Sequence, residues 1–149
     1  MSKTLSYKGT LDMGLEDRIN LRTMNGKTGY KITKFQIIGT VPGAASAEYV
    51  AKITKRPDPN IGSGVNFSNN DLLAVIFMNA DTNPAYASTQ NIIFDTDEFN
   101  QDIFVNITDA SGGTSPCNYY IELEAFKIND LEATQLTLAN IKTITSTPI

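Results

Sequence analysis

The chain has 149 residues, of which 16 are Asp or Glu and 12 are Lys or Arg, so its formal net charge is −4. This balance argues against nucleic-acid binding, which depends on a clustered basic surface. The chain contains no histidine, which excludes Ser-His-Asp and Cys-His catalysis and removes the commonest transition-metal ligand. The one cysteine, Cys117, cannot form an intramolecular disulfide, and without an imidazole to activate it we interpret it as a buried structural residue. We therefore expect a protein that is not an enzyme, with no catalytic, cofactor-binding or metal-binding residues.

The sequence predicts one domain spanning residues 1–149, in which residues 1–8 are a candidate N-terminal arm. Its start lacks the apolar core of a secretion signal, and no stretch approaches the roughly 20 apolar residues of a membrane span. We expect synthesis in a cytoplasm and no membrane partner.

Asn25-Gly26 lies within "RINLRTMNGKTGYKITKFQIIGTV", where apolar and polar residues alternate on both sides of it. This dipeptide suits the positive φ angles of a tight turn, so the segment predicts two strands joined by a hairpin. The alternation changes parity between Ile32 and Phe35, which indicates a β-bulge.

The middle of the chain predicts a strand over Tyr49 to Thr54, followed by the loop "RPDPNIGSG", whose proline and glycine content disfavours regular structure. The segment from Asn69 to Met78 fits a short helix or a buried strand by periodicity alone. Its length and the β-branched pair Val75 and Ile76 favour the strand.

Three more strands are predicted around 92–94, 103–108 and 119–128, with the loop "DASGGTSP" before the last. Strands spaced roughly 8–12 residues apart, with turn residues between them, are typical of a sandwich or barrel. We predict an all-β, antiparallel β-sandwich that resembles a jelly roll.

Residues 129–149 predict one short C-terminal helix and a tail. Asn129 is suited to cap the helix, and Glu132 occupies the position of a capping-box partner. Leu131, Leu138 and Ile141 share one helical face. We expect this face to dock on the edge of the sandwich.

Glu122 and Glu124 stand two residues apart in "NYYIELEAFKIND", so on a strand their side chains share one face, about 7 Å apart. That separation lies within the roughly 6.5–9.5 Å between the carboxyl groups of inverting glycosidases. The alternating Ile121, Leu123 and Ala125, however, give the inside-outside pattern of an ordinary antiparallel strand. We interpret the glutamates as its solvated face, and a hydrolase as an alternative that rests on them alone.

The segment "DTDEFNQD" concentrates acidic residues and begins with the Asp-x-Asp spacing of a calcium loop. Phe99 and Asn100 stand where that loop requires an oxygen ligand and a glycine. The acidic residues are Asp95, Asp97, Glu98 and Asp102. We interpret the segment as a solvated turn and predict no metal site.

Three stretches, "YKGTLDMGLEDRINLRTMNGKTGYKITKFQIIG", "NIIFDTDEFNQDIFV" and "NYYIELEAFKINDLEATQLTLANIK", together resemble small virion structural proteins of tailed bacteriophages from aquatic environments. The resemblance implies a capsid decoration or minor capsid component, made in the host cytoplasm and located in the virion. Its partners would be the major capsid protein, other virion proteins and copies of itself. Because shell geometry favours closed three-fold assemblies, we expect a homotrimer. The resemblance assigns no functional residues.

A second hypothesis is a receptor-binding or carbohydrate-binding module of a phage tail or fibre. Such a module would use the same sandwich, with "RPDPNIGSG" and "DASGGTSP" as its contact loops. The chain lacks the heptads or fibrous repeat of a trimerising stalk.

Overall fold

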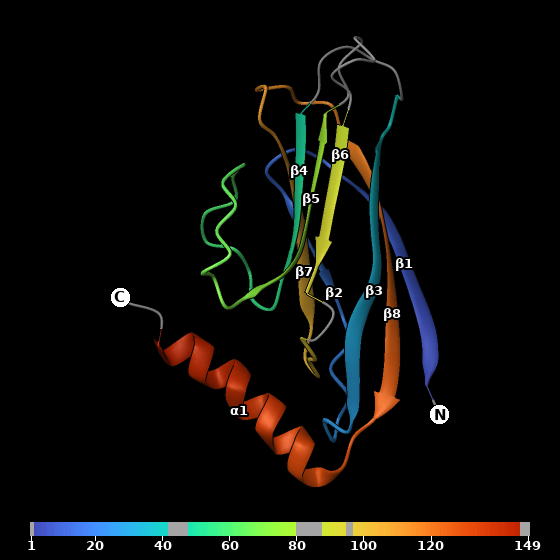
Figure 1. Cartoon of the computed structure of the whole chain (residues 1–149), viewed down its shortest axis with the longest axis vertical. Coiled ribbons are helices and arrows are strands. Elements are labelled where there is room, and N and C mark those ends of the chain that lie inside the picture. Colours follow the sequence, from blue (N-terminus) through green and yellow to red (C-terminus); the bar gives the residue numbers. More distant parts are fainter. Residues whose placement is uncertain (1, 42–47, 80–87, 95–96, 147–149) are drawn as a thin grey trace.

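A computed structural model describes residues 2–41, 48–79, 88–94 and 97–146 (Figure 1). The described residues form eight strands and one helix. In chain order these are β1 (Lys3–Leu11), β2 (Glu16–Ile19), β3 (Thr28–Gly39), β4 (Glu48–Thr54), β5 (Leu72–Asn79), β6 (Ser88–Ile93), β7 (Ile103–Asp109), β8 (Cys117–Lys127) and α1 (Asp130–Ser146).

The strands form two antiparallel sheets that pack face to face. One sheet has the order β1-β8-β3 and the other β2-β7-β4-β5-β6. Strand β6 also lies beside β3. The Asn91 side chain of β6 donates a hydrogen bond to the Phe35 carbonyl of β3. The prediction of an antiparallel β-sandwich with a C-terminal helix is confirmed.

The core lies between the sheets and is filled by alternate residues of the strands. Removing these apolar side chains from water is the main stabilising contribution of the fold. The predicted inward row of β8, Ile121 and Leu123, is completely buried. Other completely buried core residues are Phe35, Ile53, Ile103, Val105 and Ile107.

Asn25-Gly26 makes a turn, but the predicted hairpin is wrong. Gly26 has a φ of +67°, and its N–H donates to the Thr23 carbonyl. Strand β2 nevertheless pairs with β7, and β3 pairs with β8, so the chain changes sheets at this turn. The dipeptide sets a local reversal, whereas the pairing depends on which sheet buries each apolar row.

The predicted bulge in β3 is confirmed. The register with β8 shifts between Ile32 and Lys34, which leaves Thr33 without a strand partner. The Thr33 hydroxyl donates to the Glu122 carbonyl of β8 at 3.2 Å. The extra residue lets both Ile32 and Phe35 face the core.

The first residues form a strand rather than the predicted arm. Strand β1 pairs with β8 along its whole length, from Lys3 opposite Ala125 to Leu11 opposite Cys117. Among the described residues, β1 has a strand on one side only. This edge strand is difficult to predict from the sequence, because it has few apolar residues. Only its inner face is half-buried.

Residues 55–71 form a long loop that folds back over the outer face of the five-stranded sheet (Figure 1). The Lys52 ammonium of β4 donates to the Gly64 carbonyl of this loop at 3.0 Å. Lys52 and Thr54 are therefore buried, although they point away from the core. The strand favoured for the following segment is confirmed as β5.

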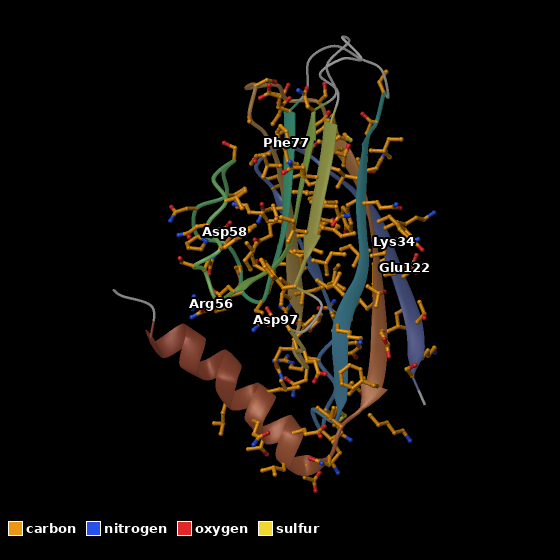
Figure 2. All side chains as sticks on the ribbon, viewed as in Figure 1. Lys34, Arg56, Asp58, Phe77, Asp97 and Glu122 are labelled. Carbon is orange, nitrogen blue, oxygen red and sulfur yellow. The ribbon has the colours of Figure 1, made fainter. Side chains whose placement is uncertain are left out.

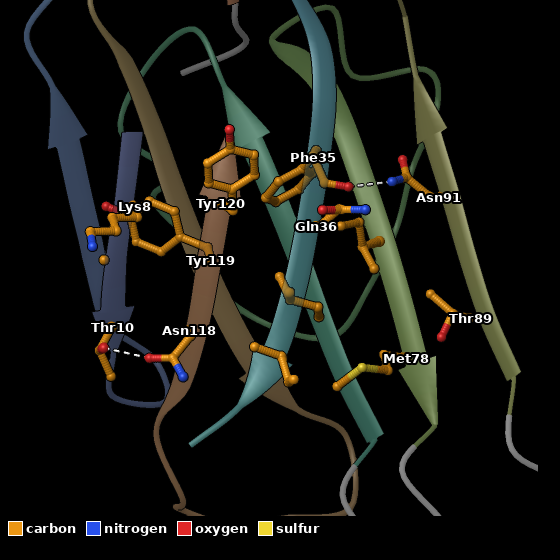
Figure 3. Close-up of a pocket in the computed structure, with 14 residues that line it drawn as sticks. Lys8, Thr10, Phe35, Gln36, Met78, Thr89, Asn91, Asn118, Tyr119 and Tyr120 are labelled. Atoms are coloured by element: carbon orange, nitrogen blue, oxygen red, sulfur yellow. Dashed lines mark hydrogen bonds between the residues drawn. The ribbon is translucent and has the colours of Figure 1, made fainter. Parts of the chain in front are cut away.

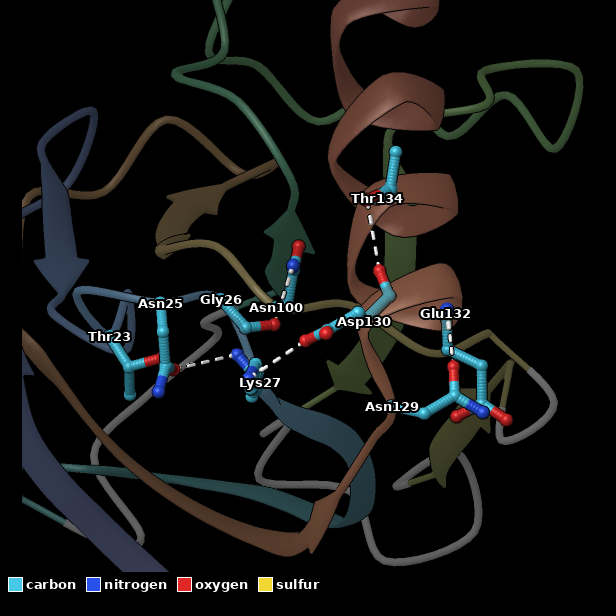
Figure 4. Close-up of polar contacts among 9 residues, drawn as sticks. All are labelled: Thr23, Asn25, Gly26, Lys27, Asn100, Asn129, Asp130, Glu132 and Thr134. Atoms are coloured by element: carbon cyan, nitrogen blue, oxygen red, sulfur yellow. Dashed lines mark hydrogen bonds and ion pairs between the residues drawn. The ribbon is translucent and has the colours of Figure 1, made fainter.

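Helix α1 begins as the capping residues predict. The Glu132 N–H donates to the Asn129 side-chain oxygen at 2.8 Å (Figure 4). Lys27, in the turn before β3, forms an ion pair with Asp130 at 2.8 Å. The Asn100 amide donates to the Gly26 carbonyl at 3.1 Å. The ion pair with Lys27 attaches the first turn of the helix to the base of the sandwich.

The predicted docking face of α1 is wrong. Ala133 is the buried residue, and its carbonyl and the Thr137 hydroxyl accept hydrogen bonds from Asn100. Leu131 and Leu138 are 66% and 52% exposed, and the Ile141 side chain lies outside the described residues. The helix leaves the sandwich diagonally (Figure 1), and these two leucines are exposed to solvent.

Candidate functional site

Glu122 and Glu124 lie on the outer face of the three-stranded sheet, each beside a lysine of β3. Lys34 is 3.4 Å from the Glu122 carboxylate, and Lys31 is 3.6 Å from that of Glu124. The Tyr120 hydroxyl also donates to Glu122 at 3.0 Å. Figure 2 shows Lys34 and Glu122 on the open side of this sheet. The arrangement is a cross-strand charge ladder, which agrees with the interpretation of a solvated strand face.

Among the acidic residues of the predicted turn that the structure describes, Asp102 is the one that is buried. Its Oδ1 accepts the N–H groups of Leu21 and Arg22, both at 2.8 Å, and its Oδ2 accepts Arg18 Nε at 2.8 Å. Burial alone would raise the pKa of Asp102, but these donors together hold that pKa below its usual value. Asp102 thus joins β2, through Arg18, and the segment that follows β2 to the start of β7.

The rest of that turn offers no cation site in the described part of the chain. Asp95 lies outside the described residues, and Asp97 and Glu98 are joined by no third nearby ligand of the His, Cys, Asp or Glu type. Phe99 enters the core and exchanges two backbone hydrogen bonds with Tyr30. The turn therefore continues the sandwich.

Cys117 begins β8 and is completely buried. Burial raises the pKa of its thiol to about 12, so very little thiolate forms at neutral pH. This environment is that of an inert structural cysteine.

A hollow of about 830 Å³ lies where β3 passes β6 (Figure 3). Its lining includes the apolar residues Phe35, Ile37 and Met78, together with Lys8 and Tyr120. Asn91 bridges it through the hydrogen bond to Phe35. We interpret this hollow as the gap left where the two sheets separate, because β3 and β6 share no strand pairing.

A second hollow, here called the loop pocket, has a volume of about 460 Å³ and lies between the loop 55–71 and the outer face of β4. Most of its lining residues have polar side chains, and Pro59 and Leu72 add apolar surface. The polar residues include Lys52, Arg56, Asp58, Asn66, Asn69 and Asp71.

The loop is ordered by its own side chains. Three Asp or Asn side chains each accept the backbone N–H two residues further along, which is the local turn that these residue types favour. The pairs are Asp58 with Asn60 at 3.0 Å, Asn66 with Ser68 at 2.9 Å, and Asn69 with Asp71 at 3.0 Å. A segment without regular structure thereby obtains fixed polar walls.

The charges of the loop pocket are matched in pairs. Lys52 Nζ lies 3.5 Å from the Asp58 carboxylate, and Arg56 Nε donates to Asp71 Oδ2 at 2.7 Å. Figure 2 shows Arg56 and Asp58 on the loop side of the molecule, opposite Glu122. The second oxygen of Asp71, Oδ1, is buried and has no hydrogen-bond partner.

An aromatic ring stands next to the loop pocket. Phe67 is 57% exposed and meets Phe94 edge to face, with ring centroids 5.3 Å apart. The two rings line a smaller hollow of about 320 Å³ that shares Asn69, Asn70 and Leu72 with the loop pocket. The sequence placed contact residues in "RPDPNIGSG" but missed the following "VNFSNND", whose asparagines and exposed phenylalanine complete the site.

The other predicted contact loop, "DASGGTSP", is closed on itself by Asp109. Its carboxylate accepts the Glu48 N–H at 3.0 Å and the Ser111 N–H and hydroxyl at 2.9 and 2.6 Å. Burial would raise the pKa of Asp109, but these hydrogen bonds hold that pKa below its usual value. Asp109 is thus a structural residue of the turn.

No model of a known protein family matches the sequence, and no curated protein matches it significantly. Within the described residues, no helix has both the length and the apolar character needed to span a bilayer.

Proposed function

We propose that this chain is a structural protein of a tailed bacteriophage particle, a capsid decoration or minor capsid component without enzymatic activity. The resemblance of three long stretches to such proteins supports the proposal. The antiparallel sandwich supports it as well, because its strand order is compatible with a jelly roll, an architecture of viral capsid domains. Glu122, Glu124 and Asp102 each have partners within the sandwich, which is compatible with a structural role.

The observation that carries the proposal is the position of α1. The helix contacts the sandwich through Ala133 and directs Leu131 and Leu138 into solvent. Isolated exposed leucines are common, but two on one face of a projecting helix favour an interface with another chain. In the proposed particle this face contacts a second copy within a homotrimer.

Strand β1 offers a second surface for assembly. Its outer edge carries no strand among the described residues, so its backbone groups can pair with an added strand. In the proposal, the major capsid protein or another virion protein contacts this edge.

Two measurements test the proposal. The chain should be found by mass spectrometry in purified particles of the phage that encodes it, and light scattering should give the mass of a trimer for the isolated protein. Leu131→Ala combined with Leu138→Ala should dissociate the trimer. Glu132→Ala, at an exposed position of the same helix about a quarter turn away from the two leucines, is the matched control and should leave it intact. A monomer at every concentration, together with absence from the particles, would refute the proposal.

A further inference from the structure

The loop pocket has no structural need for so many polar side chains. The loop 55–71 must cover β4, which apolar residues could do equally well, yet it presents amide, carboxylate and hydroxyl groups around an open volume of about 460 Å³. This volume lies within the roughly 300–1,000 Å³ of small-molecule sites.

The paired charges limit what the pocket can bind. A divalent cation would meet the Lys52 ammonium beside Asp58, and the Arg56 guanidinium beside Asp71. A phosphate would meet the two carboxylates instead. Because each charge is already balanced, the pocket favours a neutral ligand that both donates and accepts hydrogen bonds.

Asp71 Oδ1 is the clearest unused group. Asp71 lines the pocket and is only 7% exposed, and this oxygen lacks a partner although burying an unpaired polar atom is unfavourable. Because this oxygen is covered, a ligand hydroxyl can reach it only after the Asp71 side chain turns it toward the open volume, where the two would form a charge-assisted hydrogen bond.

Donors stand on the same wall. Asn66 and Asn69 use their side-chain oxygens in the local turns, so each retains its NH₂ group as a donor. An acceptor and two donors on one wall suit the neighbouring hydroxyl groups of a sugar ring. Each of these hydroxyls can donate one hydrogen bond and accept others.

Phe67 supplies the remaining feature. Its half-exposed ring borders the pocket through the shared Asn69 and Asn70, where it can contact the apolar face of a pyranose. We infer that the loop pocket binds a neutral saccharide, with Asp71 accepting a hydroxyl, Asn66 and Asn69 donating, and Phe67 stacking on the ring. This inference is independent of the virion role, because it concerns a surface opposite the glutamate ladder and uses no residue of α1 or β1.

The test is an NMR titration of the isotope-labelled full chain with methyl glycopyranosides of glucose, galactose, mannose and N-acetylglucosamine, together with an array of neutral and anionic glycans. We expect saturable shifts confined to Lys52, to residues 54–72 and to Phe94 for at least one neutral sugar. Phe67→Ala and Asp71→Asn should each weaken binding roughly tenfold or more. Tyr120→Ala, which removes an exposed aromatic residue from the opposite sheet, is the control and should leave binding unchanged.

Three results would overturn the inference. The first is no shift with any glycoside and no neutral glycan retained on the array. The second is saturable binding of calcium chloride or inorganic phosphate to the same residues in place of sugars. The third is equal weakening by Tyr120→Ala and Phe67→Ala. Circular dichroism would show whether Asp71→Asn fails to fold. In that case Phe67→Ala still tests the inference, because this exposed ring contributes little to the core.

Discussion

Asp102 holds together two parts of the sandwich that are far apart in sequence, so its replacement should be costly. The two backbone hydrogen bonds from Leu21 and Arg22 go to an ionised acceptor and contribute roughly 1.5 kcal/mol each. The Arg18 side chain is 54% exposed, and solvent screening limits its contribution to about 0.5 kcal/mol. Asp102→Ala, which also leaves the buried Leu21 N–H unpaired, should therefore lower the free energy of unfolding by about 3–4 kcal/mol.

Asp102→Asn removes the negative charge of the side chain and keeps its shape. The asparagine oxygen can still accept the two N–H groups, but its NH₂ group replaces the oxygen that faced Arg18. We expect a loss of about 1–2 kcal/mol at neutral pH. The pKa of Asp102 lies below its usual value in the folded state, so its contribution is complete above the unfolded pKa of about 4 and is lost as the pH falls through the folded pKa. The wild type and Asp102→Asn should therefore become more alike in stability on acidification.

Urea unfolding followed by circular dichroism and tyrosine fluorescence measures both effects. Asp130→Asn is the matched control, because this carboxylate is 83% exposed in its pair with Lys27 and should change stability by less than about 0.5 kcal/mol. The reasoning is refuted if Asp102→Ala costs no more than the control, or if the difference between wild type and Asp102→Asn widens in acid.

Three further predictions concern the interior. Cys117 should not react with Ellman's reagent in the folded protein at mildly alkaline pH, and one thiol should appear on adding urea; rapid labelling without urea would contradict its burial. Asn106→Val should raise the urea midpoint by an amount equivalent to about 1 kcal/mol, because both polar atoms of the buried amide lack partners; a lower midpoint would show that the amide is hydrogen-bonded. Gly9→Ala should lower the thermal unfolding midpoint, at a cost of about 1–3 kcal/mol, since its Cβ would lie 2.7 Å from the Tyr119 hydroxyl that donates to Asp17; an unchanged midpoint would exclude this contact.

Local features of the sandwich were predictable from the sequence. The alternation around Leu123 predicted a core-facing strand, the parity change at Thr33 predicted the bulge, and Asn129 predicted the helix start. Each depends on neighbours within a few residues, where side-chain period and turn chemistry determine the structure.

The failures involve partners distant in sequence. Asn25-Gly26 could not reveal that β2 and β3 belong to different sheets. The leucines of α1 defined a face, but not whether that face meets the sandwich. The sequence predicted the contact loop of the loop pocket but not its β4 wall. The burial of Lys52 in that wall depends on a loop that returns to cover it. Alternation within a strand indicates two faces and does not show what covers the outer one.

The cover that the loop 55–71 places over β4 limits how this protein can vary. An insertion or deletion there would uncover Thr54 and remove both partners of the Lys52 ammonium, Asp58 and Gly64, so the loop behaves as part of the folded body in spite of its irregular backbone. Point substitutions facing the hollow are a different matter, because they leave that cover in place. Divergence of this surface between relatives should therefore proceed by exchange of side chains at constant loop length, and peptide insertion is better directed to the exposed turn at Gly112.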